Sequence, residues 1–155
     1  QMTDNERSFP AKMYTKDNML LQQAGKNGEL MGCMRREIKT FFDYESAPWS
    51  NMVLGEVQNF PGKWSSYPPH HHPQPEVYYY RYERPEGFGA CFLGDDVYKI
   101  KDGSCACIPG GTTHSQVTAP AFPMSYCWMI RHLEGNPWTD RVVDPRYTWI
   151  DAKML

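Results

Sequence analysis

The sequence predicts an all-β fold, a barrel or sandwich of short antiparallel strands. Turn signals built on glycine, proline and asparagine recur roughly every 8–12 residues, between runs rich in β-branched and aromatic side chains. Helix signals are nearly missing, and the chain shows neither an internal repeat nor a low-complexity linker. With 155 residues, of which 41% are hydrophobic, one domain with a packed core is the simplest expectation.

The chain divides into three expected regions. Residues 1–51 are expected to form an N-terminal arm and the first strands, and residues 52–134 to form the core. Residues 135–155 are a tail rich in aromatic side chains. We expect this tail to pack across the barrel or to cover an edge strand, with a direct contact to a ligand as the alternative.

The first region holds the weaker signals. Residues 9–14 are expected to be an arm that packs on the domain or on a partner, and residues 18–22 a short strand or helical turn. Residues 30–42 predict one or two strands, with a helix as the alternative that Gly32 and the β-rich end disfavour. Further strands are expected at the histidine-bearing stretch and at 52–60, 76–82, 88–93, 97–101, 104–108, 115–118 and 123–132.

Two of these strands show a clear alternation of side chains. In the strand over 76–82, one face is expected to carry Glu76 with three tyrosines: Tyr78, Tyr80 and Tyr82. In the strand over 123–132, one face is expected to carry large apolar side chains: Met124, Tyr126, Trp128 and Ile130. These faces should point into the core.

Residues 67–76, with the sequence YPPHHHPQPE, carry the clearest chemical signal. His70 and His72 are two positions apart, so on a strand they point to the same side. His71 has the opposite parity and is expected to be exposed. Prolines after the histidines bend the chain before Glu76, so a hairpin-like turn would bring the carboxylate back toward the imidazoles.

A second stretch, residues 103–114 with the sequence GSCACIPGGTTH, ends in another histidine. Together with His70, His72 and Glu76, His114 completes a set of three imidazoles and one carboxylate. Such a set suits a divalent transition metal ion such as Zn, Mn, Fe, Ni or Co. We therefore predict that the four side chains converge on one metal ion.

The two stretches resemble the two motifs of the cupin superfamily. The matching residues are His70, His72 and Glu76 in the first motif, and Gly103, Pro109, Gly111 and His114 in the second. Thr118 stands where the second motif usually has asparagine. The resemblance implies a single cupin domain, a double-stranded β-helix or jelly-roll-like antiparallel barrel, with the metal held by His70, His72, Glu76 and His114.

A narrower resemblance covers about residues 53–150. The segments 64–70, 76–81 and 87–89 resemble the C-terminal half of the 5-deoxy-glucuronate isomerase family of inositol breakdown, which is related to the 5-keto-4-deoxyuronate isomerases of pectin breakdown. Members of that family are usually nearly twice as long, and their segment between the histidines and the glutamate is longer. The resemblance implies aldose–ketose isomerisation of a deoxy-uronate through a metal-stabilised enediolate.

That reaction assigns roles to further residues. Glu76 is the candidate base, and Tyr78 or Tyr80 would donate to the developing oxyanion, although packing in the barrel wall is the more ordinary role for a tyrosine. The carboxylate of a uronate needs a cationic anchor, for which the candidates are Lys99, Arg131 and His132. By default, the lysine and the arginine would be solvated surface charges.

Two other functions remain open at this stage. A histidine-rich cupin site can also bind Fe(II) and O2, which would make the protein a dioxygenase. A non-catalytic, metal-stabilised sugar-binding protein is the second alternative. In each sugar-related case the partner is a small-molecule sugar acid, and we expect a homodimer or larger assembly that covers apolar surface.

Composition excludes several classes of partner. The formal charge of −2 implies no general affinity for nucleic acid or membranes, and the chain has neither a long apolar run nor a secretory signal. Its five cysteines are odd in number and lack zinc-ribbon spacing. Buried, reduced thiols are the expected state, which fits the cytoplasm, and a redox pair at Cys105 and Cys107 is the minor alternative.

Overall fold

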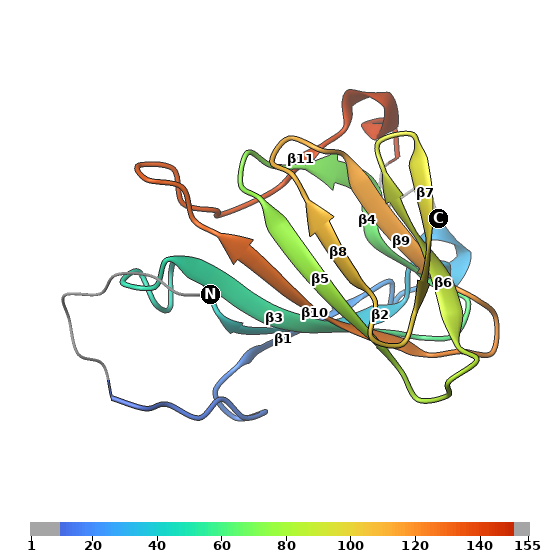
Figure 1. Cartoon of the computed structure of the whole chain (residues 1–155), viewed down its shortest axis with the longest axis horizontal. Coiled ribbons are helices and arrows are strands. Elements are labelled where there is room, and N and C mark those ends of the chain that lie inside the picture. Colours follow the sequence, from blue (N-terminus) through green and yellow to red (C-terminus); the bar gives the residue numbers. More distant parts are fainter. Residues whose placement is uncertain (1–9, 151–155) are drawn as a thin grey trace.

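The computed structural model describes residues 10–150, which form eleven strands and two short 3-10 helices. The strands build two antiparallel sheets that face each other (Figure 1). The predicted all-β fold is confirmed. Among these residues no helix is long and apolar enough to cross a membrane. The expectations for the start of the arm and the end of the tail fall partly on residues 1–9 and 151–155, outside the described residues.

The larger sheet has six strands, in the order β1-β2-β3-β10-β5-β8. Their bounds are β1 Leu20–Ala24, β2 Arg36–Phe42, β3 Met52–Asn59, β10 Met124–Arg131, β5 Glu76–Tyr82 and β8 Cys105–Ile108. The central strand β10 pairs along its length with β3 and over most of its length with β5. Strands β1 and β8 are the edges of this sheet.

The smaller sheet has five strands, in the order β11-β4-β9-β6-β7. Their bounds are β11 Val142–Val143, β4 Trp64–His71, β9 His114–Thr118, β6 Phe88–Leu93 and β7 Asp96–Lys101. The register of β4 against β9 shifts between Ser65 and His70, and Ser66 within this irregular stretch has a positive φ of 50°. After the shift, His70 lies directly opposite His114.

The core lies between the sheets and is built by side-chain alternation. In β5 the residues of one parity, from Glu76 to Tyr82, are buried, and in β10 the same holds from Met124 to Ile130. Both predicted inward faces are therefore confirmed. Because alternate side chains of a strand point to opposite faces, Arg131 at the end of β10 faces outward and is exposed.

The region before β3 contains a turn and a strand. The segment Glu29–Gly32 is a 3-10 helix, η1, in which Leu30 and Met31 adopt positive φ values of 51° and 52°. The chain then continues as β2, so the strand prediction for 30–42 is confirmed in its second half and the helix alternative is wrong. Residues 18–22 overlap β1, which is a strand rather than a helical turn.

The tail runs beside the smaller sheet. Strand β11 pairs with β4 at His70 and His71, and the 3-10 helix η2, Pro145–Tyr147, follows it. The side chain of Asp144 accepts a hydrogen bond from the Thr113 hydroxyl at 2.8 Å, which ties this segment to the loop before β9. Trp138 packs edge-on against Trp128, with ring centroids 5.9 Å apart.

Two expectations about exposure need correction. His71 is half-buried rather than exposed, because Val142 of β11 pairs with it at the edge of β4.

All five cysteines are free thiols, yet Cys91 alone is buried, Cys127 is intermediate, and the exposed ones are Cys33, Cys105 and Cys107. The last two lie two positions apart on β8, an edge strand of its sheet, and therefore point to the same, exposed side.

Candidate metal centre

The four predicted metal donors come from three neighbouring strands. His70 lies near the end of β4 and His72 directly follows that strand. Glu76 begins β5, and His114 begins β9. All four side chains are buried, with exposed fractions of 6%, 4%, 4% and 1% in that order. The turn that leads from β4 in the smaller sheet to β5 in the larger one therefore brings the first three donors to the place where β9 supplies the fourth.

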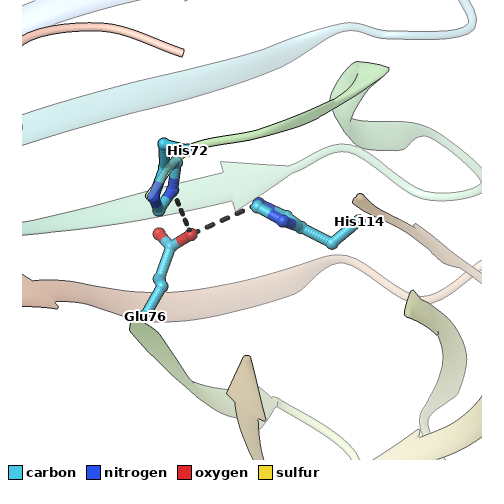
Figure 2. Close-up of side chains that lie close together, drawn as sticks. All are labelled: His72, Glu76 and His114. Carbon is cyan, nitrogen blue, oxygen red and sulfur yellow. Dashed lines mark hydrogen bonds and ion pairs between the residues drawn. The ribbon is translucent and has the colours of Figure 1, made fainter. Parts of the chain in front are cut away.

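The geometry of these donors is compact. Oε2 of Glu76 lies 3.2 Å from Nε2 of His72 and 3.2 Å from Nε2 of His114, as Figure 2 shows. One ligand atom from each of these three residues lies within 4.8 Å of the others. The ring of His70 adjoins the group, with its centroid 4.7 Å from that of His114.

The backbone fixes the tautomer of all three imidazoles. In each ring Nδ1 hydrogen-bonds to a carbonyl oxygen, which only accepts, so Nδ1 carries the proton. The acceptors lie two residues away from their histidines: Pro68 at 2.9 Å from His70, Gln74 at 2.9 Å from His72, and Thr112 at 3.0 Å from His114. In the neutral form of each ring, Nε2 then carries the lone pair through which a histidine binds a metal ion.

This arrangement fits a divalent metal ion. Nε2 of His114 is buried and makes no hydrogen bond of acceptable geometry, although it lies within ion-pair distance of Glu76. In the neutral tautomer with the proton on Nδ1, the lone pairs of His72 and His114 face a carboxylate oxygen with no proton between them. A cation relieves that repulsion, and imidazole nitrogen with carboxylate oxygen is a donor set that first-row divalent ions favour.

The electrostatics support the same protonation states. Burial, and then the proximity of His114, lower the pKa of His70 to about 2, so this ring is neutral. Burial alone would raise the pKa of Glu76, but its contacts with His114 and His72 outweigh burial and leave the pKa below its ordinary value. The site therefore presents a neutral imidazole and an ionised carboxylate, the forms in which these groups bind metals.

Three of the four donors, His70, His72 and Glu76, line a cavity of about 140 Å³. Its remaining wall includes Tyr78, Tyr126, Trp128 and Trp138, with Arg36 and Arg141 at the side shared with a larger outer chamber of about 510 Å³. Trp138 lines both spaces and its ring lies 6.2 Å from that of His72. The tail thus contributes to the cavity as well as packing on the barrel.

The structure separates the two tyrosines predicted to act in catalysis. Tyr78 lines the cavity, whereas Tyr80 is fully buried behind it and donates its hydroxyl proton to Gln116 at 3.0 Å. Gln116 in turn donates to Ser66 at 2.8 Å, and Ser66 lies 3.1 Å from the hydroxyl of Tyr78. Tyr78 is therefore positioned to act in the cavity, and Tyr80 supports it through a hydrogen-bonded chain.

The three residues expected to bind a carboxylate do not line the cavity. Lys99 lies on β7, with its ammonium over the ring of Phe88 at 4.9 Å, and Arg131 is exposed at the end of β10. Nδ1 of His132 accepts a hydrogen bond from the Trp138 backbone at 3.0 Å.

Two arginines that sequence reasoning missed line the cavity instead. Arg36 has the same parity in β2 as Ile38, which also lines the cavity, and this alternation was the available signal. Nothing in the local sequence distinguishes Arg141 from the other tail charges.

Comparison with known proteins agrees with this architecture. The profile of the KduI/IolB family matches residues 1–150. The chain is 25% identical to the 5-deoxy-glucuronate isomerase of Geobacillus thermodenitrificans over 163 aligned positions, covering 96% of this chain and 56% of the relative.

Solved structures show the same fold. An IolB-like protein from Salmonella typhimurium superimposes with a TM-score of 0.80 at 17% identity, covering 93% of this chain and 57% of the other. A cupin-2 domain protein from Rhodospirillum rubrum superimposes with a TM-score of 0.62 at 16% identity, covering 92% and 86%. The cupin fold expected from the two motifs is therefore confirmed.

The chain spans slightly more than half the length of the isomerase and of the IolB-like protein, at 56% and 57%. Its own match nevertheless extends over nearly all of the sequence, from the first strands to the tail. The match includes both stretches that supply the buried histidines and the glutamate. On these grounds, the chain belongs to the KduI/IolB family.

Proposed function

We propose that this protein is a metal-dependent isomerase of a sugar acid, which interconverts the aldose and ketose forms of a deoxy-uronate. The observation that carries the proposal is the buried cluster of His72, Glu76 and His114, joined by His70, at the wall of the inner cavity. The family match supports the reaction class, and the relative from Geobacillus bears the name of such an isomerase. The donor set alone would suit many reactions.

Aldose–ketose isomerisation needs a positive centre near two neighbouring oxygens while a proton moves between their carbons. A divalent ion held by His70, His72, Glu76 and His114 would supply that electrostatic stabilisation when bound. The protein must add a proton donor, a proton acceptor and a shell that keeps water away. Each of these has a candidate in the cavity wall.

Tyr78 is the candidate proton donor. Its burial, and then the adjacent charge of Glu76, raise the pKa of its hydroxyl well above the ordinary value, so it keeps its proton at neutral pH. Ser66 lies 3.1 Å from that hydroxyl and orients it. A protonated phenol facing the cavity can donate to an oxygen on which negative charge develops.

Glu76 is the candidate proton acceptor. It is the one carboxylate among the described residues that line the inner cavity, and its lowered pKa keeps it ionised. The aromatic side chains of Tyr126, Trp128 and Trp138 form an apolar part of the wall. Such a wall limits the access of water to a reactive intermediate.

The proposal is tested by assaying the purified protein under nitrogen with 5-deoxy-glucuronate and 5-keto-4-deoxyuronate, following isomer formation by proton NMR. Turnover that disappears after chelation and returns with one of Zn, Mn, Fe, Ni or Co is the expected result. Activity that requires O2 would instead identify a dioxygenase. Binding of the sugar acid without any turnover would identify a non-catalytic sugar-binding protein.

A further inference from the structure

Arg36 is a buried arginine, and most of its hydrogen-bond donors have no partner among the described residues. It begins β2, is 3% exposed and lines the inner cavity. One nitrogen, Nη1, donates to the carbonyl of Met34 at 2.9 Å. Within residues 10–150, no carboxylate forms an ion pair with this guanidinium. Buried arginines are normally paired, because an isolated charge is costly to desolvate.

Arg141 brings a second positive charge to the same place. It immediately precedes β11, which pairs with β4 at His70, so it approaches the cavity from the sheet opposite β2. Burial lowers the pKa of Arg36, Tyr126 raises it, and the positive charge of Arg141 lowers it further. After burial and His114, the same charge also lowers the pKa of His70. Its side chain likewise forms no ion pair with the described part of the chain.

The two arginines lie at the junction of two spaces. Both line the inner cavity together with His70, His72 and Glu76, and both line the outer chamber. The carboxylates of the outer chamber are Asp43, which accepts hydrogen bonds from Ser46, and Asp140, which accepts from the backbone of Arg141. Neither lines the inner cavity, where the carboxylate is Glu76. Within the described residues, Glu76 pairs with His72 and His114 and forms no ion pair with either arginine.

We propose that Arg36 and Arg141 form a clamp for the carboxylate of an acidic sugar, and that this clamp selects the acid over the neutral sugar. The inference that the ligand is a sugar rests on the proposed function. A guanidinium fork matches the two oxygens of a carboxylate, and an anion bound between the arginines offsets their mutual repulsion. The rest of the bound molecule then extends toward His70, His72 and Glu76, where its oxygens meet the metal donors.

Binding, rather than turnover, tests the clamp. Calorimetric titration of the full chain measures its affinity for D-glucuronate and for D-glucose, the matching neutral sugar. The ratio of the two affinities is the preference for the acid. We expect Arg36→Met and Arg141→Met each to weaken glucuronate binding by roughly 10- to 100-fold and to leave glucose binding unchanged. Arg131→Met is the matched control, because Arg131 is exposed on β10 and lies outside the cavity. This control should bind glucuronate as the unmodified chain does.

The results separate the clamp from the proposed function. Arg141 is exposed, so its variant should fold even if loss of the buried Arg36 impairs folding. An unchanged preference for glucuronate in Arg141→Met, or no preference in the unmodified chain, would overturn the clamp. Tighter binding of glucose 6-phosphate than of glucuronate would also overturn it, since the anion would then be a phosphate. Arginine-dependent glucuronate binding without isomerisation of any sugar acid would retain the clamp and refute the isomerase.

Discussion

His70 of β4 lies directly opposite His114 of β9, with their ring centroids 4.7 Å apart. The pairing of two strands far apart in sequence thus places one histidine from each motif at the same point of the smaller sheet. Glu76, from the larger sheet, reaches across the barrel to the same group. The site therefore depends on both sheets, and its assembly requires the closed barrel.

Changing His72 to alanine should remove the metal. His72 supplies one of three clustered ligand atoms, so its loss should weaken metal affinity by more than roughly 100-fold, which exceeds the usual effect of losing an outer hydrogen-bond partner. Metal content after purification, measured by mass spectrometry, checks this. His71→Ala is the control, because His71 is half-buried on the other side of β4 and should leave metal content intact. Full metal content in His72→Ala would contradict the metal centre.

Metal removal should also lower thermal stability. A ligand that binds only the folded state stabilises it by about 2.7 kcal/mol at a concentration of 100 times its Kd. We expect EDTA to lower the Tm of the unmodified protein and added Zn or Mn to raise it, whereas His72→Ala should respond to neither. An equal response of the variant would show that the ions act elsewhere on the protein.

The two inward tyrosines should respond differently to loss of their hydroxyl groups. Tyr78→Phe removes a donor that faces the cavity, so we expect kcat to fall by roughly 100-fold with unchanged metal content. Tyr80→Phe leaves Oε1 of the buried Gln116 without its partner, so its main effect should be a loss of about 1–3 kcal/mol of stability. Kinetics and denaturant unfolding of both variants distinguish these outcomes. Equal losses of kcat would contradict the assignment of Tyr78.

The sequence predicted the local part of the site and missed the part that depends on distant contacts. The spacing of His70 and His72, and the proline-bounded return to Glu76, are readable within one short stretch. His114 was predicted from its donor chemistry and from the resemblance to the second cupin motif, because the pairing of β4 with β9 that brings it to the other donors has no local signal. The alternation in β10 also places Arg131 on the face opposite the core, a signal that the prediction of Arg131 as an anchor did not use.

Arg36 shows why the residues that line the cavity were harder to predict. Its burial results from β2 lying between β1 and β3 beside the cavity, and from the tail segment that reaches the same place. Neither contact can be inferred from the residues next to Arg36. An arginine near the start of a strand is ordinarily a surface residue, so its type alone favoured the wrong environment.

The predicted homodimer concerns the apolar surface around the first strand. β1 is an edge strand on which Leu20 and Leu21 are 53% and 49% exposed, and Met31 nearby in sequence is 84% exposed. An exposed apolar edge favours association with another chain. Light scattering at micromolar concentration should therefore give at least twice the chain mass of 18.0 kDa. Leu21→Lys should reduce that mass, and a monomeric mass for the unmodified protein would refute the prediction.

Stability should fall as the pH drops below about 6.5, in part through His132. Nδ1 of this ring accepts a hydrogen bond from the backbone of Trp138, so it needs its lone pair. Burial lowers the pKa of His132 in the folded protein below the ordinary value of 6.5, so the unfolded chain binds the proton first. The neutral His132 ring makes its full contribution to the stability of the folded protein above pH 6.5. This contribution is lost as the pH falls toward the lower pKa that His132 has in the folded protein.

The variant His132→Gln isolates this contribution from those of the other histidines. The difference in Tm between the variant and the unmodified protein should shrink as the pH is lowered from 7.5 to 5.5. Only the unmodified protein has the His132 ring, which becomes protonated over this range. Trp138 lines the cavity beside His72, so release of its backbone should also loosen that wall. Tryptophan fluorescence across the same pH range would follow this change. A Tm difference that stays constant with pH would show that the hydrogen bond to Trp138 does not depend on protonation of His132.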